Sequence, residues 1–315
     1  PKYGSSNFLD TYFQPNYFWA INDHSDMVLS PYFSWKNGFI PYATYRGYVE
    51  KGEISLSGSV LKDKDMDNKT RGSLFVKGRY EVSDNWLANI DWKYVSDSQY
   101  MRDMSLDGKT DPWLTSHLGL QYFNNRDYAT IDTYYFKTNS YYTHRSKQRD
   151  RYDGAFVLPS LMYEKYNQLT DYGLYTRNLL SYATVVHDDS AANSNRATMI
   201  NEIVLPHTSR FGEKMRVIGS VKSDLYYVDD YLNAKNENVT GSTARVFPQL
   251  GLEWKLPFIK ANEESRQIIE PIVVGVLAPN ASNKRDRIPD EDSQNAFLDD
   301  VNVLDLDRYS GYDRN

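Results

Sequence analysis

Residues 245–256 read RVFPQLGLEWKL, and this stretch decides the fold class. Apolar and polar residues alternate here at almost every position: Val246, Pro248, Leu250, Leu252, Trp254 and Leu256 against Arg245, Gln249, Glu253 and Lys255. Successive side chains of a β-strand point to opposite faces, so the stretch predicts a strand with one apolar and one charged face.

The same alternation recurs along the whole chain. It is strong at 53–61, 86–94 and 214–228, and weaker at 26–35, 39–50, 72–80, 117–124, 127–137, 152–165, 170–186, 197–206 and 267–277. The pattern predicts an all-β protein of roughly 13 or 14 antiparallel strands, long enough for a transmembrane β-barrel rather than a sandwich. In such a barrel the apolar face meets lipid, and charges such as Lys222, Asp224, Glu253 and Lys255 line a wet lumen or are simply solvated.

Composition limits the alternatives. The chain has 315 residues, a net charge of −6, no cysteine and 27 tyrosines, which suit strands and membrane interfaces. The acidic balance lacks the basic footprint of a nucleic-acid-binding protein. The longest apolar run, Ile272 to Ala278, is far shorter than the about 20 residues of a spanning helix, so a membrane would have to be crossed by strands.

A soluble antiparallel sheet with one dry face remains the alternative fold. Trp86, Trp92 and Trp254, expected near strand ends, favour the barrel because interfacial aromatic girdles lie there. Polar stretches at 62–70, 96–111, 140–151, 187–196, 229–243 and 278–300 predict long loops or turns, and 81–85 and 124–127 predict short turns.

No stretch predicts catalysis or a cofactor. The five histidines, His24, His117, His144, His187 and His207, lack the spacing of metal ligands. Asp63, Asp65 and Asp67 alternate like a calcium loop, but Asn68 stands where such a loop requires glycine. We therefore expect no enzyme activity, no metal and no cofactor.

Several ordered motifs resemble the LptD family of lipopolysaccharide-assembly barrels. An aromatic cluster after Pro15 is followed by Asp26, Ser30-Pro31 and Tyr45-Arg46 near the start of the chain. The remaining motif positions are Asp97, Tyr100 and Asp103 in VSDSQYMRD, Glu270 and Pro271, and Asp307, Arg308, Ser310, Gly311, Asp313 and Arg314 in DRYSGYDR. The last motif is the most specific.

The resemblance implies a function in assembly rather than catalysis. It implies insertion of lipopolysaccharide into the outer leaflet of the bacterial outer membrane, through the barrel lumen and a lateral gate. The implied partners are lipopolysaccharide, outer-membrane lipids, the plug lipoprotein LptE and the periplasmic Lpt bridge proteins. Pro15 and Pro31 are candidate gate residues, because proline removes a ladder hydrogen bond; alternatively they only start strands or mark bulges.

The family places a periplasmic jelly-roll before the barrel and a further barrel half after the last motif. We therefore expect residues 1–315 to be the first part of the barrel domain, without the jelly-roll and the C-terminal barrel half. The alternative function is an outer-membrane porin or uptake channel. A porin is expected to end in an aromatic strand and an uptake receptor to begin with a plug domain.

Overall fold

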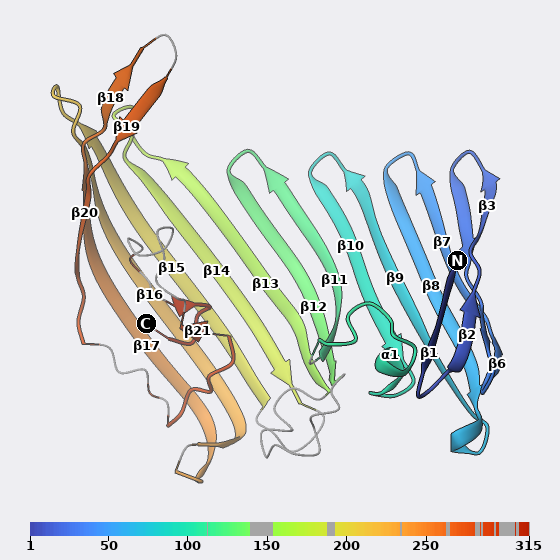
Figure 1. Ribbon diagram of the computed structural model, residues 1–315. Coiled ribbons are helices and arrows are strands. Elements are labelled where there is room, and N and C mark those ends of the chain that lie inside the picture. Colours follow the sequence, from blue (N-terminus) through green and yellow to red (C-terminus); the bar gives the residue numbers. More distant parts are fainter. Residues whose placement is uncertain are drawn as a thin grey trace. The chain divides into compact units, whose positions relative to one another are not determined.

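The computed structural model describes residues 1–111, 113–138, 154–187, 193–233, 235–262, 265–280, 284, 286–292, 294–295, 306 and 309–314. Regular structure in these residues is almost entirely strand (Figure 1). The helices among them are a 3-10 turn, η1 (Lys64–Met66), and the one-turn helix α1 (Tyr100–Asp103). Neither of these helices has the length or the apolar character needed to span a bilayer. The all-β prediction is confirmed.

Fourteen of the described strands form one sheet, within the predicted number. Its order is β20-β17-β16-β15-β14-β13-β12-β11-β10-β9-β8-β7-β4-β3. The bounds are β3 (Tyr17–Asn22), β4 (Ser25–Leu29), β7 (Tyr42–Val49), β8 (Gly52–Asp63), β9 (Lys69–Ser83), β10 (Trp86–Val95), β11 (Trp113–Asn124), β12 (Asp127–Thr138), β13 (Ala155–Gln168), β14 (Tyr175–Val186), β15 (Asn193–Thr208), β16 (Lys214–Leu232), β17 (Asn238–Lys255) and β20 (Ile272–Leu277).

Three smaller sheets complete the described strands. The first has the order β1-β2-β5-β6, with β1 (Lys2–Ser6), β2 (Asp10–Gln14), β5 (Tyr32–Ser34) and β6 (Gly38–Ile40). The others are the pairs β18 (Phe258–Ala261) with β19 (Arg266–Ile269) and β21 (Gln294–Asn295) with β22 (Tyr309–Ser310).

The chain divides into two compact units. Unit 1 comprises residues 1–123, 130–159 and 185–190, and unit 2 comprises 124–129, 160–184 and 191–315. In unit 1 a hydrophobic core lies on one face of the strands: Leu9, Tyr32, Ile40, Leu61, Val95, Tyr100, Met101, Met104, Leu106 and Leu114. Strand residues therefore pack there against the connection 96–111 and the N-terminal strands.

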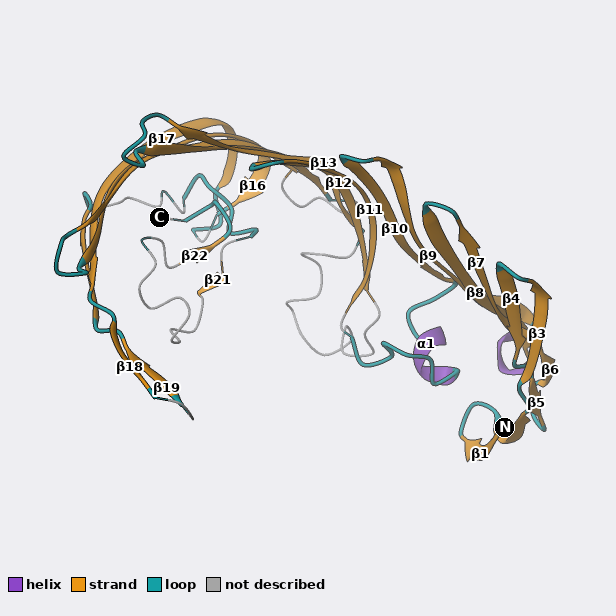
Figure 2. Ribbon diagram, turned by 90° about the horizontal axis from the view of Figure 1, so that it is seen from above, coloured by secondary structure: helices purple, strands orange, loops and turns teal. Residues whose placement is uncertain are grey.

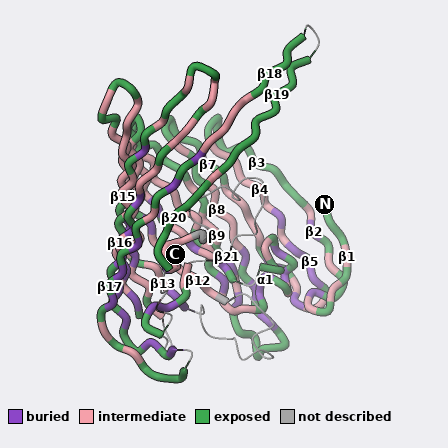
Figure 3. Tube along the Cα trace, turned by 90° about the vertical axis from the view of Figure 1, so that its left-hand side faces the viewer, coloured by how far each residue is buried: buried purple, intermediate pink, exposed green. Residues whose placement is uncertain are grey.

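Unit 2 shows the two-faced strand most clearly. β16 and β17 pair with Asp224 opposite Arg245 and Ser223 opposite Val246, in a register that is regular from Lys214 to Val228. Arg245 is 7% exposed, whereas its neighbour Val246 is 68% exposed. We call the face with Arg245 the covered face and the face with Val246 the open face; burial alternates between them along β15–β17 (Figure 3).

A C-terminal segment, whose described residues lie between 284 and 314, covers part of this charged face. Figure 2 shows it on the inner side of β16 and β17. Lys222 and Asp224 are each 4% exposed beneath it. The expectation that these two charges line a wet lumen or are solvated is therefore wrong, because the chain's own segment packs on them.

Several predicted boundaries need correction. The loop predicted at 229–243 is wrong: β16 continues to Leu232 and β17 begins at Asn238, with a register shift between Val228 and Tyr231. A bulge at Asp230, whose φ is 55°, interrupts the alternation that a regular strand would show. The break predicted at 62–70 is confirmed but is shorter, because β8 ends at Asp63, η1 follows and β9 begins at Lys69.

Proline explains a second group of errors. The single strands expected at 26–35 and 39–50 are each divided, at Pro31 and Pro41. The strand expected at 267–277 is likewise broken at Glu270 and Pro271 between β19 and β20. Proline cannot donate a ladder hydrogen bond and restricts the residue before it, so each strand stops there. The turns predicted at 81–85 and 124–127 are confirmed, at residues 84–85 and 125–126.

Candidate functional site

In unit 1 a buried arginine, Arg71 near the start of β9, gathers three carboxylates. Its Nη1 donates to Asp63 at 2.7 Å, and its Nη2 donates to Asp97 at 2.7 Å and Asp103 at 2.8 Å. The guanidinium also lies over the rings of Phe8, at 5.2 Å, and Tyr100, at 5.4 Å. These four charged residues, the Arg71 cluster, join two connections to the strand β9.

Local sequence explains how the connection 96–111 reaches Arg71. The Asp97 carboxylate accepts hydrogen bonds from Ser96 Oγ at 2.8 Å and from the Gln99 backbone N–H at 3.1 Å, which forms a turn before α1. Tyr100 and Asp103 are three residues apart on α1, so both side chains lie on one side of it. The Tyr100 hydroxyl lies 2.8 Å from Ser59 Oγ on β8.

The pKa shifts differ within the Arg71 cluster. Burial opposes the charged form of Asp97, but hydrogen bonds from Arg71 and Ser96 outweigh it and lower the pKa of this carboxyl. Burial dominates at Asp103 and raises its pKa despite the bond from Arg71. Burial also raises the pKa of Tyr100 to about 12. One guanidinium therefore holds Asp97 ionised and leaves Asp103 easier to protonate.

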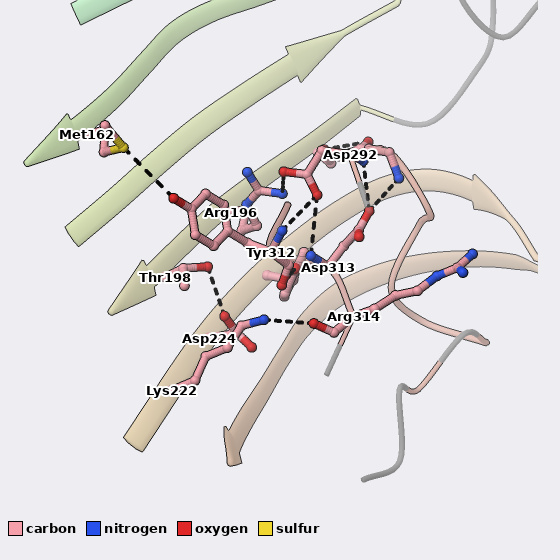
Figure 4. A network of polar contacts seen from close by, with 12 residues as sticks. Met162, Arg196, Thr198, Lys222, Asp224, Asp292, Tyr312, Asp313 and Arg314 are labelled. Atoms are coloured by element: carbon pink, nitrogen blue, oxygen red, sulfur yellow. Dashed lines mark hydrogen bonds and ion pairs between the residues drawn. The ribbon is translucent and has the colours of Figure 1, made fainter. Parts of the chain in front are cut away.

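In unit 2 a second arginine, Arg245 on β17, binds the C-terminal segment. Its Nε donates to the Asp224 carboxylate at 2.8 Å, and Nη1 and Nη2 donate to the backbone oxygens of Asp313 and Tyr312 at 2.8 and 2.9 Å. Asp224 also accepts from Thr198 at 2.8 Å, and Lys222 donates to the Arg314 backbone oxygen at 2.7 Å (Figure 4). We call Asp224, Arg245, Tyr312 and Asp313 the Arg245 cluster.

Two stretches of the C-terminal segment also bind each other. The Asp313 carboxylate accepts from the backbone N–H groups of Glu291, at 2.5 Å, and Asp292, at 3.0 Å. The Asp292 carboxylate accepts in return from the Tyr312 N–H at 3.0 Å. Gly311 has a φ of +92°, and a Cβ there would lie 2.5 Å from the Asp292 backbone oxygen. The close approach therefore requires glycine at this position.

Strand β15 also contacts this segment. Arg196 pairs with Asp292 at 2.5 Å and lies 5.2 Å from the Tyr312 ring centroid. Ser194 Oγ lies 2.7 and 2.8 Å from the two carboxylate oxygens of Glu291. Burial raises the pKa of Glu291 to about 7 and also raises the pKa of Asp292. The docked segment thus holds carboxyls that ionise only at higher pH than usual.

Two further charged groups lie on the strands beside this segment. Arg177 on β14 pairs with Glu164 on β13 and with Glu202 on β15, the latter at 3.1 Å. On the neighbouring strands the Glu253 carboxylate pairs with Arg216 and, at 2.7 Å, with Lys255. Positive and negative side chains thus alternate across β13–β17.

The structure brings together many of the predicted motif positions. Asp97, Tyr100 and Asp103 meet around Arg71, while Gly311 and Asp313 hold the C-terminal segment and Arg314 pairs with Asp290. Asp26 and Arg46 form a two-bond ion pair across β4 and β7, with distances of 2.8 and 3.1 Å.

Other predicted positions contribute less. Glu270 and Pro271 lie between β19 and β20, where the Pro271 oxygen accepts from the Leu256 N–H at 3.2 Å. Ser310 is the last residue of β22, and Asp307 and Arg308 lie outside the described residues. Pro15 lies between β2 and β3 and Pro31 between β4 and β5, in neither cluster. Among the described residues no group of three or more potential ligands could hold a metal.

Sequence reasoning missed the arginines at the centres of both clusters. Arg71 falls at the edge of an expected loop, and Arg245 looked like one more charge of a polar face. The available signal was the set of aspartates in the motifs, because buried carboxylates require a cationic partner.

Comparison with known proteins gives a consistent result. The family model described as LptD, "LPS transport system D", matches residues 69–315. "LPS-assembly protein LptD" of Mannheimia succiniciproducens is 24% identical over 267 residues, covering 80% of this chain and 32% of that protein. The protein of the same name from Escherichia coli K12 is 24% identical over 331 residues, covering 98% of this chain and 39% of that protein. The chain thus spans about a third to two fifths of these relatives.

A solved structure named "Bacterial polysaccharide outer membrane secretin" is 10% identical. The match covers 85% of this chain and 90% of that one with a TM-score of 0.33, a value too low to carry an argument.

Proposed function

The chain belongs to the LptD family, and from this premise we propose that it helps to insert lipopolysaccharide into the outer leaflet of the bacterial outer membrane. In this proposal residues 1–315 are the first part of the membrane barrel. The jelly-roll and the second barrel half belong to other parts of the full-length protein. The function is transport and assembly rather than catalysis.

The observation that carries the proposal is the two-faced sheet. Its open face in unit 2 presents apolar side chains such as Val246, Leu250 and Leu252, each about half or more exposed. Its covered face carries ion pairs and the C-terminal segment. The apolar open face can contact lipid. The polar covered face can contact the sugars of lipopolysaccharide, which cannot cross hydrocarbon without polar partners.

A lateral exit at β3 is part of the proposal. β3 is the last strand in the order of the described sheet and pairs with β4, beginning with Tyr17 opposite Leu29. Pro15 and Pro31 flank this end of the pair, where neither can donate a ladder hydrogen bond. A strand with fewer bonds separates more easily from a neighbour, so acyl chains would leave there for the membrane.

The individual protein partners are inferred from family membership alone. We infer that the plug lipoprotein LptE occupies the lumen of the full-length barrel and that the periplasmic Lpt bridge proteins deliver lipopolysaccharide to the jelly-roll. Co-purification of the full-length protein with a small lipoprotein tests the first inference. Recovery of the full-length protein without such a lipoprotein would contradict it.

Depletion of the full-length protein in living cells tests the function. Newly made lipopolysaccharide should then fail to reach a membrane-impermeant probe, while small-solute uptake stays unchanged. The opposite result, lost uptake with normal surface lipopolysaccharide, would identify a porin or uptake channel instead.

The gate has its own test. Replacing both Pro15 and Pro31 with alanine should slow the arrival of lipopolysaccharide at the surface. Pro206→Ala is the matched control, because Pro206 lies on β15, which is not a neighbour of β3 or β4 in the sheet. An unchanged rate in the double variant would remove these prolines from the gate.

A further inference from the structure

An apolar hollow of about 310 Å³ lies on one face of unit 1, across strands β7–β11. By the alternation of the strands, this face is opposite the core residues Leu61 on β8 and Val95 on β10. We call the hollow the β7–β11 groove. Besides the glycines Gly47 and Gly78, the residues of this face that line it are Val49, Ile54, Tyr80, Ala88, Ile90 and Leu118.

The register of the strands explains why the sheet is hollowed here. Gly47 lies opposite Ile54, and Ile54 lies opposite Gly78. Gly78 in turn lies opposite Ile90, and Ile90 lies opposite Leu118. A Cβ added at Gly78 would lie 3.2 Å from Ile90 Cγ2 and 3.7 Å from Ile54 Cγ1. The two isoleucines therefore form walls around a gap whose floor is backbone.

Three polar residues, Glu53, Arg79 and Asn89, also line the groove. They alternate with the apolar set along β8, β9 and β10, so their side chains belong to the other face and their backbone borders the groove. The Glu53 backbone oxygen, for example, lies 3.3 Å from the position of a Cβ at Gly78. Among the lining residues, all of which the structure describes, the Tyr80 hydroxyl is the only polar side-chain group on this face.

The two glycines are unusual in the interior of paired strands. Glycine weakens a strand, and it is found there mainly at a bulge, at a tight bend or where a ligand or another backbone approaches closely. The pairing of β8 with β7 and with β9 passes both glycines without a register shift, so neither marks a bulge. Together with the hollow, this favours the close approach of a ligand.

The size and chemistry of the groove select a narrow hydrocarbon ligand. Val49, Tyr80 and Leu118 around it are each about half or more exposed, so the groove is open to its surroundings. A second copy of the chain is the alternative occupant, but a stable protein interface uses about 20–30 residues a side. The groove has eleven lining residues, and three of them contribute backbone alone. A single acyl chain fits this limited surface better than a protein partner.

We propose that the β7–β11 groove holds one acyl chain of a bilayer phospholipid as a resident lipid. The inference rests on the proposed function, which places these strands in a membrane, and it adds a fixed lipid site to one face of them. A groove that is one chain wide suits a two-chain phospholipid, whose second chain stays in the bilayer. A lipid with more acyl chains would need a wider hollow.

Photolabelling of the full-length protein in phosphatidylcholine vesicles tests this proposal. A small fraction of the lipid carries a diazirine on one acyl chain, and mass spectrometry identifies the labelled residues. We expect label at Ile54 and Ile90, and Gly78→Leu, which fills the groove, should remove most of it. Gly275→Leu is the matched control and should leave this label unchanged. Gly275 lies opposite the exposed Leu252, and nothing lies within 4 Å of a Cβ there.

Native mass spectrometry of the same proteins tests whether the lipid is resident. The unmodified protein should retain one more phosphatidylcholine than Gly78→Leu. Gly47→Leu fills the groove from another strand and should repeat the loss even where Gly78→Leu does not fold, because the atoms nearest to a Cβ at Gly47 all belong to the Tyr45 ring and its hydroxyl. Equal retention in the unmodified protein and the filled variants would overturn the proposal. A dimer that the filled variants dissociate would assign the groove to a second copy.

Label on unit 2 separates this inference from the proposed function. Val246 and Leu250 on the open face report contact with lipid independently of the groove. If they are labelled while Ile54 and Ile90 respond equally in the unmodified protein and in Gly78→Leu, the groove is wrong and the proposed function stands. If none of these four residues is labelled, the strands do not meet lipid and the proposed function fails as well.

Discussion

Asp97 binds Arg71 through both carboxylate oxygens, with Oδ1 2.7 Å from Nη2 and Oδ2 2.8 Å from Nε. This planar two-bond geometry fixes the distance and the orientation of the connection 96–111 on β9. Asp63 and Asp103 bind the remaining side of the same guanidinium. The connection therefore depends on one strand residue.

Arg71→Met should strongly destabilise unit 1. It leaves three carboxylates without their cation, and Asp63 is only 2% exposed. Removing one partner of a buried ion pair costs about 3–5 kcal/mol, which should lower the urea midpoint of the full-length protein in detergent. Lys77→Met, an exposed cation on the same face of β9, is the control and should change stability by less than about 0.5 kcal/mol. Equal midpoints for the two variants would contradict the role of Arg71.

The strands could be predicted from the sequence because their period is a local property. In β17 every second side chain from Val246 to Trp254 is apolar, and the structure places this set on the open face. Boundaries were less predictable where a bulge or a proline interrupts the period, as at Asp230 and Pro31. Those interruptions depend on backbone conformation that single-residue hydrophobicity does not record.

The candidate sites could be predicted only in part from the sequence, for a different reason. The motif around Asp97 and the motif around Asp313 could be recognised in the sequence, but their partners Arg71 and Arg245 are 26 and 68 residues away along the chain. A strand arginine that faces solvent and one that faces a docked segment look alike in the alternation. Only the tertiary packing of the segments distinguishes them.

Gly311→Ala should release the C-terminal segment from β17. The added methyl group meets the Asp292 backbone oxygen at 2.5 Å in a left-handed backbone conformation, so we expect a cost of about 1–3 kcal/mol. Hydrogen exchange at the Tyr312 amide, which donates to Asp292, should quicken by at least about fivefold. Gly275→Ala on β20 is the control, since nothing lies within 4 Å of a Cβ there. Unchanged exchange in the Gly311 variant would show that the segment tolerates the clash.

Leu250→Lys tests whether the open face meets lipid. Leu250 lies midway along the apolar set of β17, where a cation in a bilayer costs about 2–4 kcal/mol. Met215, which pairs with Trp254 at the end of that set, should accept lysine at about 0–1 kcal/mol. The folded fraction of the full-length protein in lipid vesicles should therefore fall for the first variant only. Equal folded fractions for the two variants would contradict a lipid-facing strand.

Docking of the C-terminal segment should weaken as pH rises from about 4.5 to about 7. Burial raises the pKa of Glu291 from 4.5 to about 7, so the docked state holds a proton that the released state loses within this window. Below this pH window the Glu291 proton contributes fully to the free energy of docking. Above it that contribution, at most about 3 kcal/mol, is lost completely. Hydrogen exchange at the Tyr312 amide, corrected for its intrinsic pH dependence, should show about a tenfold or greater loss of protection. Glu291→Gln keeps a neutral partner for Ser194 and should remove most of this dependence, leaving a smaller part in the same direction from Asp292. A full pH response in that variant would assign the effect to Asp292 instead of Glu291.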